Sequence, residues 1–286
     1  MWTLRNKLGT LGRMIITKAI IPVAGWGTRR LPVTKSIEKC MLPIGNRPLV
    51  DYVVQDCVAA GITEIFFVVS EGSTQLQSYY GTNTALEAYL RANGKDASLP
   101  LVQPPADVTF HYVTQPTDGK YGTAIPVALT VPHIADGESV VVLMGDDFIY
   151  NADGSSEVAR LLTATPAGGS AMLCADVPRS ELGRYGVVET TEANEYVRIV
   201  EHPDPARAPS TLINISKYVM NYDLLKRVEA YAATEQQGEY YIIDPMNEYV
   251  RAGSAITVLP AQGEYLDGGT LQGWLYANQV VCADIA

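Results

Sequence analysis

The sequence predicts a doubly wound α/β fold, in which helices cover both faces of a mostly parallel β-sheet. Short, nearly continuous apolar runs rich in Val and Ile alternate with longer helix-patterned segments, which is typical of buried parallel strands. Glycine and proline turns separate many of these segments. With 286 residues, 47% of them hydrophobic, the chain is also large enough to bury an extensive core.

The first half of the chain follows this alternation closely. The first strand is expected over 15–23 and ends in the turn Gly25-Trp26-Gly27. A helix over 48–60 is predicted by apolar residues at helical spacing, and Gly61 supplies its stop. The other expected elements are strands at 64–70, 108–114 and 139–144, a helix at 123–130, and a Pro- and Gly-rich loop around 93–107.

In the second half the alternation is looser. Strands are expected at 170–177, 185–190, 195–201 and 214–220, and helices near 222–233 and 270–280. No fixed-period repeat or low-complexity linker divides the chain, so we expect one domain over residues 14–286. Residues 1–13 are expected to be an N-terminal extension or a cloning remnant, because Met14 directly precedes the first strand.

Charge and composition exclude several classes of protein. The 31 Asp and Glu against 21 Lys and Arg give a net charge of −10, which disfavours a nucleic-acid or membrane-surface partner. No apolar run approaches the ~20 residues of a transmembrane helix. The four cysteines form no C-x-x-C pair, so a cytoplasmic location is expected. The three histidines make no zinc-type spacing.

One short segment is basic, although the chain as a whole is acidic. Positions 29–47 contain one acid, Glu38, together with five of the 21 basic residues. The segment follows the small-residue stretch 24–28, whose backbone N–H groups can approach an anion beyond the end of the first strand. Cationic groups beside such a loop suit a polyphosphate, and the alternative is a plain turn with a solvated basic loop. The five basic residues are Arg29, Arg30, Lys35, Lys39 and Arg47.

Two acidic turns are candidates for the same site. Asp146 follows the expected strand at 139–144, and Asp267 precedes the glycine turn Gly268-Gly269 that opens the last helix. Carboxylate oxygens bind Mg²⁺ together with substrate phosphates, so this pair predicts metal-assisted chemistry at a phosphate. Alternatively, each aspartate caps an ordinary turn or helix.

Residues 24–48, AGWGTRRLPVTKSIEKCMLPIGNRP, resemble the signature of sugar-1-phosphate nucleotidyltransferases. Among these, the pattern is most similar to G-x-G-T-R-x-L-P-x-T-K-x-x-x-K-x-M-L-P of bacterial UTP–glucose-1-phosphate uridylyltransferases. The likeness extends along nearly the whole chain from residue 14. Its further landmarks are 113–115 (VTQ), 145–146 (GD), 184–188 (RYGVV), 201–203 (EHP), 208–210 (APS) and 266–269 (LDGG).

The resemblance implies a Rossmann-like, three-layer α/β/α fold with a mixed, mostly parallel central sheet, of the nucleotide-diphospho-sugar transferase type. It also implies an enzyme that makes UDP-glucose and pyrophosphate from UTP and glucose-1-phosphate, with Mg²⁺ as cofactor. Members of the family are commonly dimers or tetramers, so a homo-oligomer is implied, with no nucleic-acid or membrane partner.

The resemblance also implies roles for single residues. Arg29 would grip the triphosphate and stabilise the leaving pyrophosphate, while Lys39 would neutralise charge at the α-phosphorus. Asp146 and Asp267 would hold Mg²⁺, with Asp146 counted among the catalytic residues. Lys35 would have a supporting phosphate role. The implied nucleotide contacts are Ala24, Gly25, Gly27, Thr28, Gln115 and Gly122, and the implied sugar-phosphate contacts are Gly186, Glu201 and His202.

One departure from the family pattern concerns the sugar phosphate. His202 stands where the family has a lysine that contacts its phosphate. Imidazole is shorter and mostly neutral at pH 7. Three outcomes are open: His202 makes the contact in a pH-sensitive way, another cation replaces it, or activity is reduced. The alternative interpretation is a surface histidine in a strand-end turn.

Two further departures affect the nucleotide end. In the segment that begins at Gly238, Ile243 replaces the family's threonine, so only Glu239 and Asp244 carry over. Residues 119–124 differ from the usual run near the base, which leaves the preferred base open.

The leading hypothesis therefore has alternatives within and beyond its class. A thymidylyl- or cytidylyltransferase acting on a hexose-1-phosphate would use the same chemistry. A nucleotide-sugar-binding regulator with weakened catalysis is kept open by His202. A dinucleotide-dependent dehydrogenase fits least, because the third glycine of its fingerprint is missing.

Overall fold

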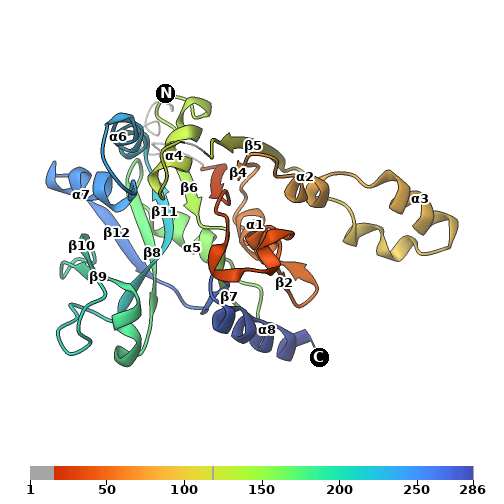
Figure 1. Ribbon diagram of the computed structural model, residues 1–286. Helices are drawn as coiled ribbons and strands as arrows, with labels where there is room; N and C mark the ends of the chain where they lie inside the picture. The colour runs from red at the N-terminus through yellow and green to blue at the C-terminus, as the bar shows by residue number, and fades with distance from the viewer. Residues whose placement is uncertain (1–15, 118, 286) are drawn as a thin grey trace, which may run out of the picture.

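A nine-stranded mixed β-sheet forms the centre of the protein (Figure 1). The computed structural model describes residues 16–117 and 119–285. Strand β1 (Lys18–Pro22) lies between β4 (Glu64–Ser70) and β6 (Val140–Leu143), and β5 (Thr109–Gln115) lies outside β4. All three of these pairings are parallel, so the carboxyl ends of four strands meet at one edge of the sheet.

The second half of the chain adds strands that run mainly antiparallel. Strand β11 (Leu212–Met220) pairs antiparallel with β6 and also with β8 (Ser170–Asp176). Beyond β8 lies the parallel strand β12 (Ile256–Pro260). A hairpin of β9 (Gly186–Thr190) and β10 (Tyr196–Glu201) joins β11 through a single bridge at Ile213.

Helices cover both faces of this sheet because successive strand residues point to opposite sides. One buried cluster includes Ala19 and Ile21 of β1 with residues of α1 (Leu49–Ala59), α5 (Glu157–Ala164) and α8 (Leu271–Ile285). The other includes Ile20 with residues of α4 (Ala124–Thr130), α6 (Tyr222–Ala233) and α7 (Ile243–Arg251). The predicted three-layer fold with a mixed, mostly parallel sheet is confirmed.

The helix and strand boundaries predicted from the sequence are close to those in the structure. The strand predicted at 64–70 and the helix predicted at 222–233 have these bounds, and the other predicted elements differ by a few residues at their ends. Outside the segment between β4 and β5, seven helices and strands were not expected, of which α5, α7 and β12 belong to the main layers. The others are short strands: β2 (Pro43–Ile44) with β3 (Arg47–Pro48), and β7 (Asp147–Tyr150) with β13 (Glu264–Asp267).

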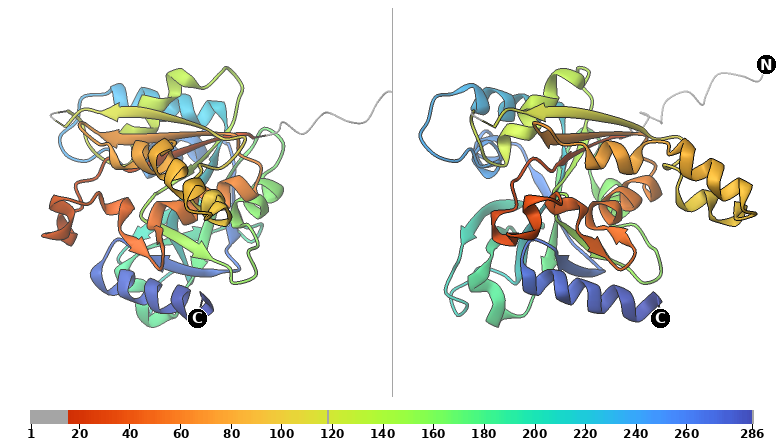
Figure 2. Two further views of the ribbon diagram at one scale, coloured as in Figure 1. Left: turned by 90° about the vertical axis from the view of Figure 1, so that its right-hand side faces the viewer. Right: turned by 45° about the vertical axis from the view of Figure 1, so that its right-hand side comes forward.

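The largest difference from the sequence-based prediction lies between β4 and β5. Helices α2 (Gln75–Tyr80) and α3 (Thr84–Ala92) and a 3₁₀ turn (Asp96–Leu101) form an arm that projects from the body (Figures 1 and 2). The sequence analysis placed only a loop around 93–107. In α3 only Glu87 and Leu90 are buried, so most of this helix is accessible to solvent.

Two predictions about the organisation of the chain are not tested by the structure. The single domain over 14–286 stays a prediction, and residues 1–13 lie outside the described residues. Within 16–117 and 119–285, no helix is both long and apolar enough to cross a membrane. All four cysteines are free thiols, and Cys282 alone of the four is exposed.

Candidate active site

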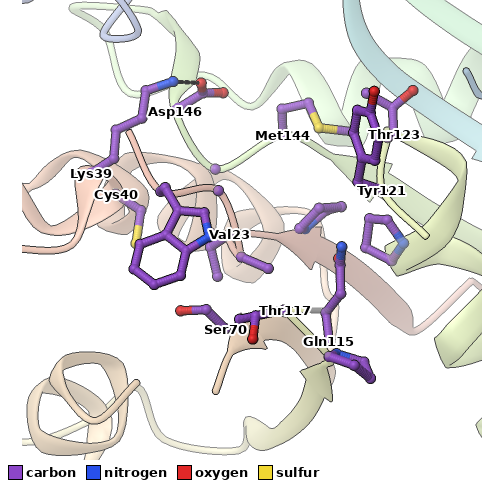
Figure 3. Close-up of a pocket in the computed structure, with 18 of the residues that line it drawn as sticks. Val23, Lys39, Cys40, Ser70, Gln115, Thr117, Tyr121, Thr123, Met144 and Asp146 are labelled. Carbon is purple, nitrogen blue, oxygen red and sulfur yellow. Dashed lines mark hydrogen bonds and ion pairs between the residues drawn. The ribbon is translucent and has the colours of Figure 1, made fainter. Parts of the chain in front are cut away.

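The carboxyl ends of the parallel strands surround a cavity of about 390 Å³ (Figure 3). Parallel strands deliver the loops that follow them to the same edge, which is why residues distant in the sequence meet there. Lys39 and Asp146 lie at one end of the cavity, with Gln115 and Thr117 toward the other (Figure 3). Six of the predicted site residues line it: Ala24, Gly25, Lys39, Gln115, Gly122 and Asp146.

The loop after β1 depends on a glycine at position 27. Gly27 has φ 64°, a left-handed conformation that side chains other than glycine's rarely adopt. A Cβ at this position would lie 2.9 Å from Thr34 Cγ2 and 3.0 Å from Lys39 Cβ. The Thr34 hydroxyl donates to the Gly27 carbonyl oxygen at 2.9 Å. Gly27 therefore lets the glycine loop pack directly against the segment that carries Lys39.

Three charged groups, those of Lys39, Asp146 and Asp267, lie close together at the cavity. The Lys39 ammonium forms an ion pair with Asp146, marked by the dashed line in Figure 3. A Cβ at Gly269 would lie 2.8 Å from Asp267 Oδ1, 3.4 Å from Lys39 Nζ and 3.5 Å from Asp146 Oδ2. The Gly269 N–H donates to Asp267 Oδ1 at 2.7 Å and fixes this carboxylate. The two predicted acidic turns and the predicted lysine are thus brought together.

The carboxylates of Asp146 and Asp267 have the chemistry of a magnesium site. In the part of the chain that the structure describes, no group of three or more His, Cys, Asp or Glu side chains is arranged to hold a metal. Mg²⁺ is commonly bound by one or two carboxylates together with substrate phosphates, so two neighbouring carboxylates, with Asp146 in the cavity wall, fit such an ion.

The neighbouring aspartate, Asp147, has a different role. Its side chain is buried and forms an ion pair with the buried Lys217, and Tyr265 Oη donates to its Oδ2 at 3.1 Å. Burial raises the pKa of Asp147 to about 6, although the charge of Lys217 opposes this shift. Adjacent residues at the start of a strand point in opposite directions, so Asp146 faces the cavity and Asp147 faces the core.

Arg30 is a structural residue that the sequence analysis counted only as part of the basic segment. It is 5% exposed and donates to the carbonyl oxygens of Gly268 at 3.1 Å and Thr270 at 2.6 Å. Its guanidinium lies 5.1 Å from the centre of the Trp274 ring. Burial lowers the pKa of Arg30, and the charge of Asp267 opposes this shift. Arg30 therefore ties the basic segment to the turn that carries Asp267.

Three predicted phosphate-side residues lie outside the cavity wall. Thr28 and Arg29 belong to the 3₁₀ turn Thr28–Arg30, and Lys35 ends the next one, Val33–Lys35. All three are exposed. Arg29 makes no hydrogen bond or ion pair with any other residue in the described ranges, so no contact in this structure fixes its position.

Near Gly122, the cavity wall is formed by contact between two segments of the chain. Gly122 has φ 119°, and a Cβ there would lie 2.4 Å from the Tyr240 carbonyl oxygen. Tyr240 N donates to the Tyr121 carbonyl oxygen and Ala124 N donates to that of Tyr240, both at 2.9 Å. Glu239 also lines the cavity. Of the two residues that carry over from the family pattern in this segment, Glu239 is therefore part of the wall, and Asp244 is not among the residues that line the cavity.

The predicted sugar-side residues lie on the β9–β10 hairpin rather than in the cavity lining. Gly186 pairs with Glu201, and a Cβ at Gly186 would lie 2.8 Å from Glu201 Oε1 and 2.7 Å from Ile199 Cγ2. A hydrogen bond to Glu239 raises the pKa of Tyr241, and the nearby charge of Glu201 adds to this shift.

His202 lies at the end of β10 in a conformation unusual for a residue with a side chain. Its φ is 45°, its N–H donates to the Tyr185 carbonyl oxygen at 3.1 Å, and its Nδ1 lies 3.2 Å from the Gly183 carbonyl oxygen. The side chain is exposed. A second hollow of about 670 Å³ is lined by both Tyr185 and Asp267. Tyr185 directly precedes β9, so the start of the hairpin and the Asp267 carboxylate border the same hollow.

An open α/β sheet with a cavity at its parallel strand ends, with Lys39 and Asp146 in the cavity wall, has the usual arrangement of a small-molecule site in such folds. Residues 18–283 match the family described as nucleotidyl transferase, and the chain belongs to this family.

Individual relatives match most of the chain. The UTP–glucose-1-phosphate uridylyltransferase of Pseudomonas aeruginosa is 30% identical over 274 residues, covering 92% of this chain and 95% of the relative. The enzyme of that name from Escherichia coli K12 is 34% identical over 73% of this chain and 72% of its own length. A solved structure of UTP-bound UGPase from Acinetobacter baumannii superposes with a TM-score of 0.82 at 25% identity, covering 93% of each chain.

Proposed function

We propose that this protein is a UTP–glucose-1-phosphate uridylyltransferase, which forms UDP-glucose and pyrophosphate from UTP and glucose-1-phosphate. The observation that carries the proposal is the convergence of Lys39 and Asp146, which line the cavity, with Asp267 beside them. A volume of about 390 Å³ is within the ordinary range for small-molecule sites. Relatives that carry this name over more than nine-tenths of the chain support the substrate pair.

The first requirement of the reaction is to hold UTP in one orientation. Ala24 and Gly25 would offer backbone contacts to the base and phosphates, and Gln115 and Gly122 would hold the base. Gly27 lets this loop pack against the segment that carries Lys39. Thr28 belongs to the following exposed turn and would contact the triphosphate from the solvent side.

In the chemical step, a phosphate oxygen of glucose-1-phosphate attacks the α-phosphorus of UTP. A new P–O bond forms while the bond to the β-phosphate oxygen breaks, and pyrophosphate leaves with its electron pair. Lys39 would neutralise charge at the α-phosphorus, and the exposed Arg29 would fold over the leaving pyrophosphate. Such transfers depend on in-line positioning and electrostatic stabilisation.

Asp146 and Asp267 would hold Mg²⁺, which when bound supplies charge neutralisation to the phosphates. In the structure, the Lys39 ammonium forms an ion pair with the Asp146 carboxylate. We infer that Lys39 exchanges this carboxylate for the α-phosphate when substrate binds, because the ammonium can satisfy only one of them fully at a time.

Glucose-1-phosphate would bind along the β9–β10 hairpin. The missing side chain of Gly186 leaves room beside the Glu201 carboxylate, which would accept hydrogen bonds from sugar hydroxyls. His202, at the end of the same strand, would contact the phosphate. We further propose a cytoplasmic, single-domain enzyme that assembles as a homodimer or homotetramer, as the resemblance implies.

The test is a panel of nucleoside triphosphates crossed with several sugar-1-phosphates, with pyrophosphate release as the measurement. The expected result is the highest kcat/KM with UTP and glucose-1-phosphate in the presence of Mg²⁺. Turnover with dTTP or CTP far above UTP would replace the uridylyl assignment with a thymidylyl- or cytidylyltransferase. Absence of turnover with every triphosphate, despite nucleotide-sugar binding, would favour a regulator.

A further inference from the structure

Glu38 is the single acid within the basic segment 29–47, and none of the proposed catalytic steps uses it. It directly precedes Lys39, the first residue of the 3₁₀ turn Lys39–Met41. Such a short turn has little stability of its own, so the position of Lys39 must depend on contacts with other parts of the chain.

Those contacts come from the turn between β4 and α2. Ser73 Oγ donates to the Glu38 carboxylate, lying 2.9 Å from each of its oxygens, and Gln75 N–H donates to Oε1 at 3.3 Å. In the reverse direction, Glu38 N–H donates to Gln75 Oε1 at 3.0 Å, and Gln75 Nε2 donates to the Ser36 carbonyl oxygen at 2.9 Å. These reciprocal bonds join residues 36–38 to residues 73–75 and are called the Glu38 clasp below.

The clasp is anchored to the same sheet edge as the cavity. Ser73 N–H donates to the Ser70 carbonyl oxygen at 3.1 Å, and Ser70 ends β4 and lines the cavity. On its other side, the Met41 N–H donates to the Glu38 carbonyl oxygen at 2.8 Å and closes the turn that carries Lys39. A chain of hydrogen bonds thus runs from the end of β4 through Ser73 and Glu38 to Met41, in the turn that carries Lys39.

We propose that Glu38 is a positioning residue for Lys39: its clasp to Ser73 and Gln75 sets where the Lys39 ammonium meets the α-phosphate. The inference rests on the proposed function, because Lys39 takes its role from that reaction. A carboxylate suits this task because it accepts several hydrogen bonds at once and leaves the cationic end of Lys39 directed into the cavity. Misplacement of a catalytic group by about 1 Å can reduce a rate on the order of 10²-fold.

The test compares Glu38→Ala with Glu38→Gln in the full-length protein. Glu38→Ala removes all the carboxylate contacts and should lower kcat about tenfold or more, while KM for glucose-1-phosphate and Kd for UTP stay within about threefold. Glu38→Gln keeps one acceptor oxygen and should retain kcat within about threefold. Asp96→Ala removes an exposed acid of the projecting arm, outside the clasp, and serves as the control with kcat unchanged.

Three results would overturn the proposal: wild-type kcat in Glu38→Ala, an equal loss in Glu38→Gln, or an equal loss in Asp96→Ala. An equal loss in Glu38→Gln would mean that charge, and not the clasp, matters. If Glu38→Ala fails to fold, Ser73→Ala replaces it, with a kcat loss of about threefold expected and an unchanged kcat contradicting the clasp. Failure of the proposed function itself is distinguishable, since the unaltered protein would then turn over no triphosphate.

Discussion

The proposed nucleotide side and the proposed sugar side of the site are built in different ways. The proposed nucleotide side lies at the ends of parallel strands, and Arg30, Lys39 and Asp146 are fixed there by buried or part-buried contacts between distant segments. The sugar side is an antiparallel hairpin whose pair Gly186–Glu201 is set by register and whose His202 is exposed. Changes on the nucleotide side should therefore affect chemistry and stability, and changes on the sugar side mainly sugar affinity.

The largest effect is expected for Asp146→Asn. Loss of one carboxylate charge removes a proposed Mg²⁺ ligand and the partner of Lys39, so turnover should fall on the order of 10³-fold. Pyrophosphate release with UTP, glucose-1-phosphate and Mg²⁺ is the measurement. Asp153→Asn is the matched control, because Asp153 caps an exposed turn after β7 and should leave turnover unchanged. More than about a tenth of the activity remaining in Asp146→Asn would contradict the proposed metal role.

The next effect separates two adjacent arginines. Arg30→Ala removes two hydrogen bonds to carbonyl oxygens and the contact with Trp274, and should reduce the free energy of unfolding by about 2 kcal/mol. Arg29→Ala should change this free energy by less than about 0.5 kcal/mol but raise KM for UTP. Urea unfolding and steady-state kinetics measure the two quantities. Equal stability losses in both variants would show that the two side chains do not divide these roles.

A smaller effect is expected on the sugar side from Gly186→Ala. The added methyl group would meet Ile199 and the Glu201 carboxylate, and a clash of this kind typically costs about 1–3 kcal/mol. We expect KM for glucose-1-phosphate to rise about tenfold while KM for UTP stays within about twofold. Gly183→Ala is the control, since its new Cβ would have its nearest contact at 3.5 Å. A rise in KM for UTP of the same size would argue that the two halves are not separable.

The smallest effect concerns His202. A histidine loses its charge between mildly acidic and mildly alkaline pH, whereas a lysine keeps it. KM for glucose-1-phosphate should therefore rise about threefold from pH 6 to 8 in the parent protein and stay flat in His202→Lys. Steady-state kinetics at several pH values provide the measurement. A pH-independent KM in the parent protein would instead indicate that another cation contacts the phosphate.

Much of the fold could be predicted from local sequence. The apolar runs at 64–70 and 139–144 form buried strands because continuous burial on both faces leaves a distinct pattern of Val, Ile and Phe. The projecting arm was not predicted; its helix α3 buries only Glu87 and Leu90, so it lies apart from the core that the apolar runs define. The short strands β7 and β13 were also missed, because each is defined by pairing with a segment more than a hundred residues away.

By itself, the sequence determined which residue types gather at the sheet edge. Parallel strands end on one side, so a glycine loop, a lysine and an aspartate that each follow a strand must lie near one another. Only the tertiary structure decided which of two adjacent residues faces the cavity or solvent and which one packs inside the protein. Asp146 faces the cavity while Asp147 meets the buried Lys217, and Arg30 binds a turn 238 residues away while Arg29 stays in solvent. These choices depend on contacts between distant segments, which no local pattern records.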